Sequence, residues 1–188
     1  DLVARALRDA LKGTGKNVRF IYSWDDYDVF RKIPKNMPHQ EELHKHLRMP
    51  ITNVPDPFGC HASYAEHHEK EVEDIIPLVG VHPEFLYQYK KYHACVYKDH
   101  IVQALENTPI IKKILDKYRE EPLRKDWLPI SIFCDKSLKD TIKHLKYLEN
   151  YYGEYSCEGG NKEVIDFSKK QGAKQIFLGG SSTGCQKS

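Results

Sequence analysis

The chain has 188 residues, of which 29 are basic and 27 acidic, so its formal net charge is +2 at pH 7. Bulk electrostatics therefore predict neither nucleic-acid nor membrane binding, and a nucleic-acid contact would depend on short basic patches such as 112–117 and 139–146. Hydrophobic residues make up 40% of the chain, but no run approaches the roughly 18 apolar residues that a membrane helix needs. These features exclude a membrane-spanning helix and predict a globular, cytoplasmic protein.

The first elements follow the order of an α/β protein. An apolar stripe predicts a helix over 2–12 that ends at Gly13, and alternating apolar residues predict a strand over 18–22. An acidic loop, 24–28, follows. In doubly wound α/β sheets, ligands bind beyond the carboxyl ends of the strands, where this loop would lie. Because the stripe begins at once and without an initiator Met, we expect an internal piece of a longer protein.

The next segments alternate between loops and helices. Residues 34–57 carry five prolines and a short predicted helix at 40–47. Ser63 and Glu66 form a capping-box pattern that predicts a helix to about Ile76. The remaining predicted elements are a strand at 84–89, helices at 92–106 and 109–118, a strand at 129–133, and a polar, Tyr-rich lobe at 134–167.

The strongest candidate site is a possible four-ligand metal set around a proline–glycine bend. Asp56 precedes the bend, Cys60 and His61 follow it, and the predicted cap at Ser63 places His67 within about one turn of the loop. One thiolate, two imidazoles and a carboxylate can bind zinc in a closed, structural shell. Two alternatives remain: a buried cysteine among ordinary surface histidines, or His68 in place of His67.

A weaker candidate lies in the Tyr-rich lobe. Cys134 and Cys157 stand where a zinc ribbon would begin its two ligand pairs, but Ser137 and Gly159 occupy the partner positions. Since serine and glycine supply no thiolate, this set is two ligands short, and we expect the lobe to bind zinc weakly or not at all.

Five segments carry a family pattern: YSWDDYDVFRKIP (22–34), VPDPFGCH (54–61), PEFLYQ (83–88), YREEPL (118–123) and WLPIS (127–131). With them the chain resembles the class I lysyl-tRNA synthetases over about 1–168, whereas the tail from about 171 does not match. The resemblance implies a structural zinc on Asp56, Cys60, His61 and His67, and a second zinc set that is degenerate here at two of its four positions.

The resemblance also implies the substrates lysine and ATP and the partner tRNA(Lys). The family's His-x-Gly-His-type and Lys-Met-Ser-Lys-Ser-type motifs, which grip ATP, are absent from these 188 residues, as is the Trp-rich segment of the lysine pocket. Asp25, Asp26 and Asp28 lie in a loop that borders the family's active site and could hold an ammonium group. Alternatively, these carboxylates cap the next helix or pair with Arg31 and Lys32.

We therefore expect an α/β fold that comprises a partial Rossmann-like class I synthetase nucleotide fold, a connecting insert and a small degenerate zinc-ribbon lobe. The expected division is a catalytic core with the zinc loop at 1–95, a helical insert at 96–133, the ribbon-like lobe at 134–168 and a disordered tail at 169–188. The expected function is part of a lysine–tRNA ligase that is inactive in isolation. Alternatives are a non-catalytic, zinc-stabilised tRNA-binding module or an inert truncated fragment.

Overall fold

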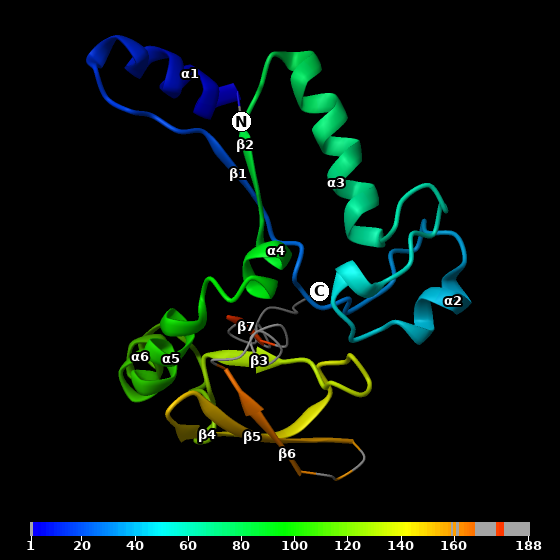
Figure 1. Ribbon diagram of the computed structural model, residues 1–188, viewed down its shortest axis with the longest axis vertical. Helices are drawn as coiled ribbons and strands as arrows, with labels where there is room; N and C mark the ends of the chain where they lie inside the picture. The colour runs from blue at the N-terminus through cyan, green and yellow to red at the C-terminus, as the bar shows by residue number, and fades with distance from the viewer. Residues whose placement is uncertain (1, 159, 161, 168–175, 179–188) are drawn as a thin grey trace. The chain divides into compact units, whose positions relative to one another are not determined.

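The computed structural model describes residues 2–158, 160, 162–167 and 176–178. Over this part the chain is an α/β structure with one parallel pair of strands and two antiparallel sheets (Figure 1). It divides into two compact units, Asp1–Tyr89 and Lys90–Ser188. Among the described helices, none has the length and apolar character that crossing a bilayer requires. The finer division into four segments remains a prediction.

Unit 1 is built from three α-helices, three short 3-10 helices and a two-stranded sheet, and α4 begins at its end. In chain order these are α1 (Leu2–Leu11), η1 (Lys12–Thr14), β1 (Ile21–Trp24), α2 (Gln40–Lys45), η2 (Ile51–Asn53), α3 (Tyr64–Ile75), η3 (Ile76–Val79) and β2 (Glu84–Tyr87).

The strands β1 and β2 pair in parallel, with Ile21 opposite Glu84 and Trp24 opposite Tyr87. Their carboxyl ends therefore lie at the same edge, and α3 lies between them in the sequence. Glu73 of α3 joins both strand ends: it accepts hydrogen bonds from Trp24 Nε1 at 3.2 Å and from Tyr87 Oη at 2.6 Å. This carboxylate links the helix to both strands.

Helix α3 begins as the capping-box pattern predicts. Ser63 Oγ accepts a hydrogen bond from the backbone N–H of Glu66 at 3.1 Å, and Glu66 Oε2 accepts one from the N–H of Ala62 at 2.8 Å. The first bond satisfies an amide that the first helical turn would otherwise leave without a partner, and the second satisfies the amide of the residue before the cap. The cap fixes the residue at which the helix starts, and so fixes where His67 lies.

A small apolar core supports the loops on either side of α2. Phe30, Leu43 and Val54 are buried together, and partly buried side chains from the surrounding loops pack against them. The backbone around this core is tied by reciprocal bonds, in which Phe30 N–H donates to Met49 and Arg48 N–H donates to Phe30. This core includes Val54 and contacts Tyr64, and these two residues flank the loop that carries Cys60 and His61.

Unit 2 contains helices followed by two antiparallel sheets. Its elements are α4 (Gln88–His93), which begins at the end of unit 1, α5 (Lys98–Glu106), α6 (Thr108–Leu115), η4 (Asp116–Tyr118), β3 (Ile130–Ile132), β4 (Ile142–Glu149), β5 (Tyr152–Cys157), β6 (Lys162–Asp166) and β7 (Ile176–Leu178).

The prediction of one continuous helix over 92–106 is wrong, because the chain turns between α4 and α5. Cys95 has a left-handed backbone (φ 58°), its N–H donates to the carbonyl of Tyr92, and the N–H of Val96 donates to that of Lys91. This pair of bonds is a Schellman motif, which ends a helix. Glycine is the usual residue at this position, so the cysteine concealed the boundary.

The predicted Tyr-rich lobe is a three-stranded antiparallel sheet with the order β4–β5–β6. Tyr155, Ile165 and Phe167 are buried on it. Residues 176–178, which fall in the tail expected to be disordered, form β7 and pair with β3 in antiparallel register. An apolar Ile-Phe-Leu run explains this strand. The rest of the predicted tail beyond 168 lies outside the described residues.

Candidate metal centre

The loop before α3 is organised by the carboxylate of Asp56, which is 1% exposed. Asp56 Oδ1 accepts the backbone N–H of Phe58 at 3.0 Å, and Oδ2 accepts those of Cys60 and His61, each at 2.8 Å. Gly59, at φ 72°, supplies the left-handed residue that the turn requires. The loop is therefore folded around one carboxylate before any ion is considered.

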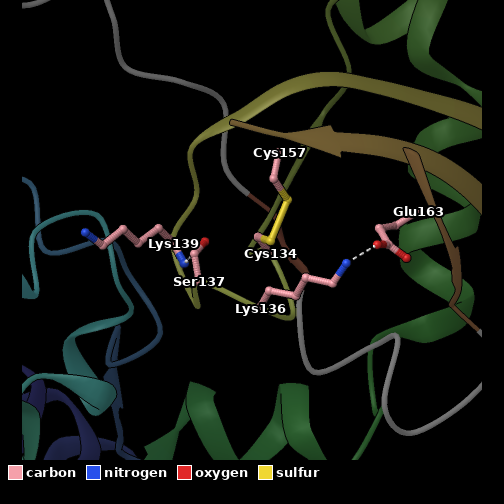
Figure 2. Close-up of a disulfide and its surroundings, with 6 residues drawn as sticks. All are labelled: Cys134, Lys136, Ser137, Lys139, Cys157 and Glu163. Atoms are coloured by element: carbon pink, nitrogen blue, oxygen red, sulfur yellow. Dashed lines mark hydrogen bonds and ion pairs between the residues drawn. A yellow bond between two sulfur atoms is a disulfide. The ribbon is translucent and has the colours of Figure 1, made fainter. Parts of the chain in front are cut away.

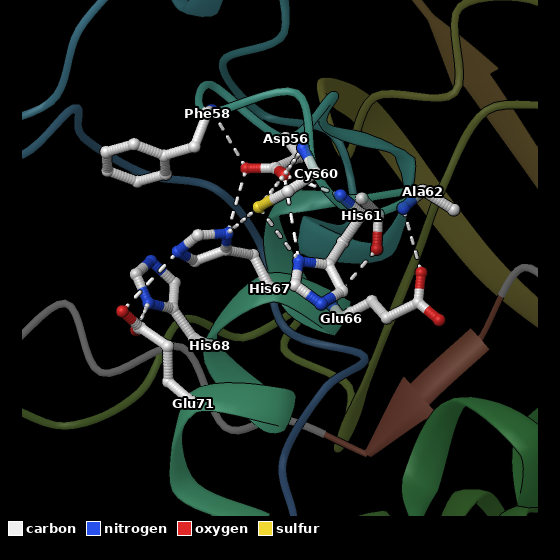
Figure 3. A network of polar contacts seen from close by, with 10 residues as sticks. Asp56, Phe58, Cys60, His61, Ala62, Glu66, His67, His68 and Glu71 are labelled. Atoms are coloured by element: carbon white, nitrogen blue, oxygen red, sulfur yellow. Dashed lines mark hydrogen bonds and ion pairs between the residues drawn. The ribbon is translucent and has the colours of Figure 1, made fainter. Parts of the chain in front are cut away.

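The four side chains that the sequence singled out converge at this loop, as Figure 3 shows. Cys60 Sγ lies 3.1 Å from His61 Nδ1, 3.2 Å from His67 Nδ1 and 3.3 Å from Asp56 Oδ2. Asp56 Oδ1 lies 3.3 Å from His67 Nδ1, and Oδ2 lies 3.9 Å from His61 Nδ1. One donor atom from each of the four residues thus falls within 4.8 Å of every other.

These separations fit a tetrahedral zinc ion. Zinc bonds of about 2.0–2.3 Å at tetrahedral angles place neighbouring donor atoms about 3.3–3.6 Å apart. Five separations among the four residues run from 3.1 to 3.9 Å, with Asp56 measured through Oδ2 to Cys60 and His61 and through Oδ1 to His67. One sulfur, two imidazole nitrogens and one carboxylate are also donors that suit zinc, whereas calcium and magnesium prefer oxygen donors alone. Both geometry and chemistry accommodate the ion that the family resemblance implies.

Local electrostatics set the protonation of Asp56 and Cys60. Burial opposes ionisation of Asp56, but hydrogen bonds from the amides of Phe58, His61 and Cys60 outweigh it and hold its pKa well below the usual range. Burial, followed by the hydrogen bond to Asp56, raises the pKa of the Cys60 thiol. A divalent cation would reverse the preference of the thiol, because a coordinating thiol is deprotonated.

Of the two adjacent histidines, His67 rather than His68 faces this cluster. His67 is only 8% exposed, and its ring stacks on Phe58 with ring centroids 4.5 Å apart. The His68 ring lies across the edge of His67, and its Nδ1 lies 2.9 Å from Glu71 Oε2. The geometry therefore favours His67 over His68 as the fourth candidate ligand.

The three acidic residues that follow β1 have different surroundings. Asp25 is exposed. Asp26 is buried, accepts the backbone N–H of Tyr89 at 2.6 Å and is hydrogen-bonded to Glu69, and burial raises its pKa despite these bonds. Asp28 makes a two-pronged ion pair with Arg31, at 3.0 Å for each bond. They do not converge on one point as the metal candidates do.

Cys134 and Cys157, the weaker candidate ligands, are joined in a disulfide with their Cα atoms 6.5 Å apart (Figure 2). A sulfur in a disulfide is not a thiolate and does not serve as a zinc ligand. Ser137 bonds locally instead, because its Oγ accepts the backbone N–H of Lys139 at 3.3 Å. Gly159 lies outside the described residues.

Comparison with known proteins shows to which family the chain belongs. The family model described as tRNA synthetases class I (K) matches residues 2–175. The chain belongs to that family. A lysine–tRNA ligase of Treponema pallidum is 47% identical over 176 residues, which cover 93% of this chain and 33% of the relative. One from Borreliella burgdorferi is 49% identical over 166 residues, covering 88% of this chain and 31% of the relative.

A more distant lysine–tRNA ligase, from Thermococcus kodakarensis, is 45% identical over 143 residues, covering 74% of this chain and 26% of that protein. The chain thus spans about a third of the length of the bacterial relatives that it matches. The similarity therefore concerns one portion of a class I tRNA synthetase.

Two residues beside the four candidate ligands were not predicted from the sequence. Phe58 stacks on His67, and Glu71 Oε1 lies 3.5 Å from His67 Nε2. A signal for Glu71 was present, because residues four apart share one face of a helix. Phe58 gave no such signal, since its contact depends on how the loop folds back.

Proposed function

We propose that this chain is part of a lysine–tRNA ligase, an enzyme that activates lysine with ATP and transfers it to tRNA(Lys). The observation that carries the proposal is the 47% identity to such a ligase over 93% of the chain. The proposal includes a cytoplasmic location. We expect no activity from the 188-residue chain alone, because it contains neither of the motifs with which the family grips ATP.

We further propose that unit 1 contributes to a Rossmann-like nucleotide fold. The parallel β1–β2 pair, joined by a connection that includes α3, supports this. Sites in such folds lie beyond the carboxyl ends of strands, where Asp25 follows β1. Asp25 is the candidate for holding the lysine ammonium group, because Asp26 and Asp28 already have internal partners. Lysine activation and transfer would need the remaining portion of the ligase.

The proposed zinc has a structural role. Four protein ligands, Asp56, Cys60, His61 and His67, would fill a tetrahedral shell and leave no position for a water or a substrate. When bound, the ion would supply charge that holds the thiolate and the carboxylate together. In unit 2, we interpret the β4–β5–β6 lobe as a degenerate zinc ribbon in which the Cys134–Cys157 bond replaces the ion.

A chimera tests the proposed function. Residues 2–167 of this chain would replace the matching segment of the Borreliella burgdorferi ligase, to which the chain is 49% identical. We expect the chimera to catalyse lysine-dependent ATP–pyrophosphate exchange and to charge tRNA(Lys) with lysine. The 188-residue chain, assayed in parallel, should catalyse neither.

The control is the same chimera carrying Cys60→Ser, which should lose zinc and with it stability and activity. A chimera that folds and binds zinc but shows no exchange would refute the proposal. Exchange by the pure 188-residue chain would refute the expectation that it is inactive alone.

A further inference from the structure

The two ring nitrogens of His67 face different partners. Nδ1 lies within the donor cluster, 3.2 Å from Cys60 Sγ and 3.3 Å from Asp56 Oδ1. Nε2 points the other way and lies 3.5 Å from Glu71 Oε1. A neutral imidazole carries one proton, so a ring that coordinates through Nδ1 must carry its proton on Nε2. The proton then lies on the nitrogen that faces a carboxylate.

We propose that Glu71 is a positioning residue of the metal centre, which accepts the Nε2–H of His67 and so orients the ring and presents Nδ1 to zinc. This inference rests on the proposed zinc site. Carboxylates that accept the second N–H of a metal-bound histidine fix its tautomer and increase its basicity. Glu71 has the sequence spacing and the charge for this role, and its Oε1 lies 3.5 Å from His67 Nε2.

Helix geometry and ring packing hold the two groups in place. Glu71 is four residues beyond His67 on α3, so both side chains lie on one face of the helix. On the loop side, Phe58 stacks on the His67 ring at an interplanar angle of 22°. The ring is therefore confined between an aromatic face, the donor cluster and the Glu71 carboxylate, as Figure 3 shows.

The two carboxylate oxygens of Glu71 face two different histidines. Oε1 faces His67, while Oε2 lies 2.9 Å from His68 Nδ1. The contact with His68 uses the other oxygen and leaves Oε1 facing His67, although the Glu71 side chain is 57% exposed. Since Glu71 lies on the far side of the His67 imidazole from Cys60 and Asp56, it cannot complete the same coordination shell. Its role is to orient a ligand.

Two other roles for Glu71 make different predictions. If Glu71 only forms a surface ion pair with His68, it contributes to the stability of the helix and not to zinc binding. A second cation held by His67, His68 and Glu71, whose donor atoms also lie within 4.8 Å of one another, would require two ions per chain. That second ion would also remove the Nε2 proton that the positioning role requires. Variants of Glu71 and His68 separate these roles.

The experiment compares Glu71→Gln with His68→Gln in the 188-residue chain. Zinc affinity is measured by competition with a chromophoric chelator, and the His67 Hε2 proton is followed by NMR in the zinc-loaded protein. We expect Glu71→Gln to weaken zinc binding about 10- to 100-fold. The Hε2 resonance should shift or be lost through exchange in this variant. His68→Gln should retain both the affinity and the resonance.

Equal affinity in Glu71→Gln and the unaltered chain would overturn the inference, as would an equal loss in His68→Gln. Two zinc ions per unaltered chain, one of them lost in Glu71→Gln, would overturn it in favour of the second cation. An unaltered chain that binds no zinc would refute the zinc proposal itself, and the two failures are therefore distinguishable. The far-UV circular dichroism of each metal-free variant confirms that the helix is intact.

Discussion

The backbone N–H of His61 donates to Asp56 Oδ2 at 2.8 Å, so one proposed zinc ligand holds the backbone of the next. The same oxygen lies 3.3 Å from Cys60 Sγ. Asp56 thus both shapes the loop and faces the space in which the ion would lie. A loop shaped in advance loses less conformational entropy when it binds a metal, since fewer residues remain to be ordered.

Replacing Cys60 tests the metal centre directly. We expect about one zinc per unaltered chain and none in Cys60→Ser, measured by mass spectrometry after gel filtration. The melting temperature should fall together with the zinc content, because binding to a structural site contributes to folding free energy. Cys95→Ser is the matched control, since this cysteine lies outside the cluster of four donors. Zinc retained by Cys60→Ser at the unaltered level would contradict the assignment.

The sequence predicted those parts of unit 1 that depend on local rules. Ser63 and Glu66 predicted the start of α3, and that start is confirmed. The bend at Pro57 and Gly59 suggested which side chains could meet. Which nitrogen of His67 faces Cys60 could not be predicted, because this depends on side-chain torsions and on the position of Phe58.

In unit 2, the features that escaped prediction depend on long-range or unusual contacts. The turn after α4 uses Cys95 where glycine is the common signal. The pairing of Cys134 with Cys157 joins residues 23 apart, and spacing alone does not reveal such a bond. Strand β7 forms only because a distant partner, β3, is available.

Glu73 should make stability depend on pH. Burial opposes its ionisation, but bonds from Lys70, Tyr87 and Trp24 lower its pKa below the ordinary 4.5. A carboxylate whose pKa is lower in the folded chain stabilises the fold above its unfolded pKa, and this contribution is lost as the pH falls through the folded pKa. We expect Glu73→Gln to cost about 1–3 kcal/mol at pH 7, and the cost to shrink below about pH 4.5.

The measurement for Glu73 is urea unfolding between pH 3 and 7, with a chelator present so that zinc does not contribute. Tyr87→Phe is the control, because it removes one donor and leaves the charge; we expect a smaller cost of about 1 kcal/mol. A Glu73→Gln cost that stays constant across this pH range would show that the charge is not responsible.

The Cys134–Cys157 bond should stabilise unit 2 by closing a chain segment of 23 residues. Such a bond contributes about 3 kcal/mol in the chain-entropy account. We expect the double variant Cys134→Ser/Cys157→Ser to be less stable by that amount, and dithiothreitol to destabilise the unaltered chain but not the variant. The readout is fluorescence of Trp127 in a Trp24→Phe background. Thiol titration of the unfolded, unreduced chain should find three reactive cysteines of the five; five would contradict the bond.

Gly153 on β5 has no room for a side chain. A Cβ at this position would lie 2.8 Å from Phe167 Cζ and 3.2 Å from Ile165 Cγ2, both in buried residues. We expect Gly153→Ala to cost about 1–3 kcal/mol through this overlap, measured by urea unfolding with Trp127 fluorescence. Gly13→Ala, where nothing lies within 4 Å, should leave stability nearly unchanged. Equal stabilities for the two variants would show that the lobe can relax around the added methyl group.

Helix α3 carries its contacts on two faces. His67 reaches the loop of Asp56 and Cys60 and Glu71 lies beside His67, while Glu73, six residues after His67, reaches the ends of β1 and β2. Each residue added to a helix turns the remainder of that helix by about 100° and advances it by about 1.5 Å. A single insertion between His67 and Glu73 would therefore leave either the loop or the sheet without its partner. The number of helical residues in this segment therefore sets the spacing and the rotation between the loop contacts and the sheet contacts. Substitutions can be accommodated in this segment far more readily than insertions or deletions.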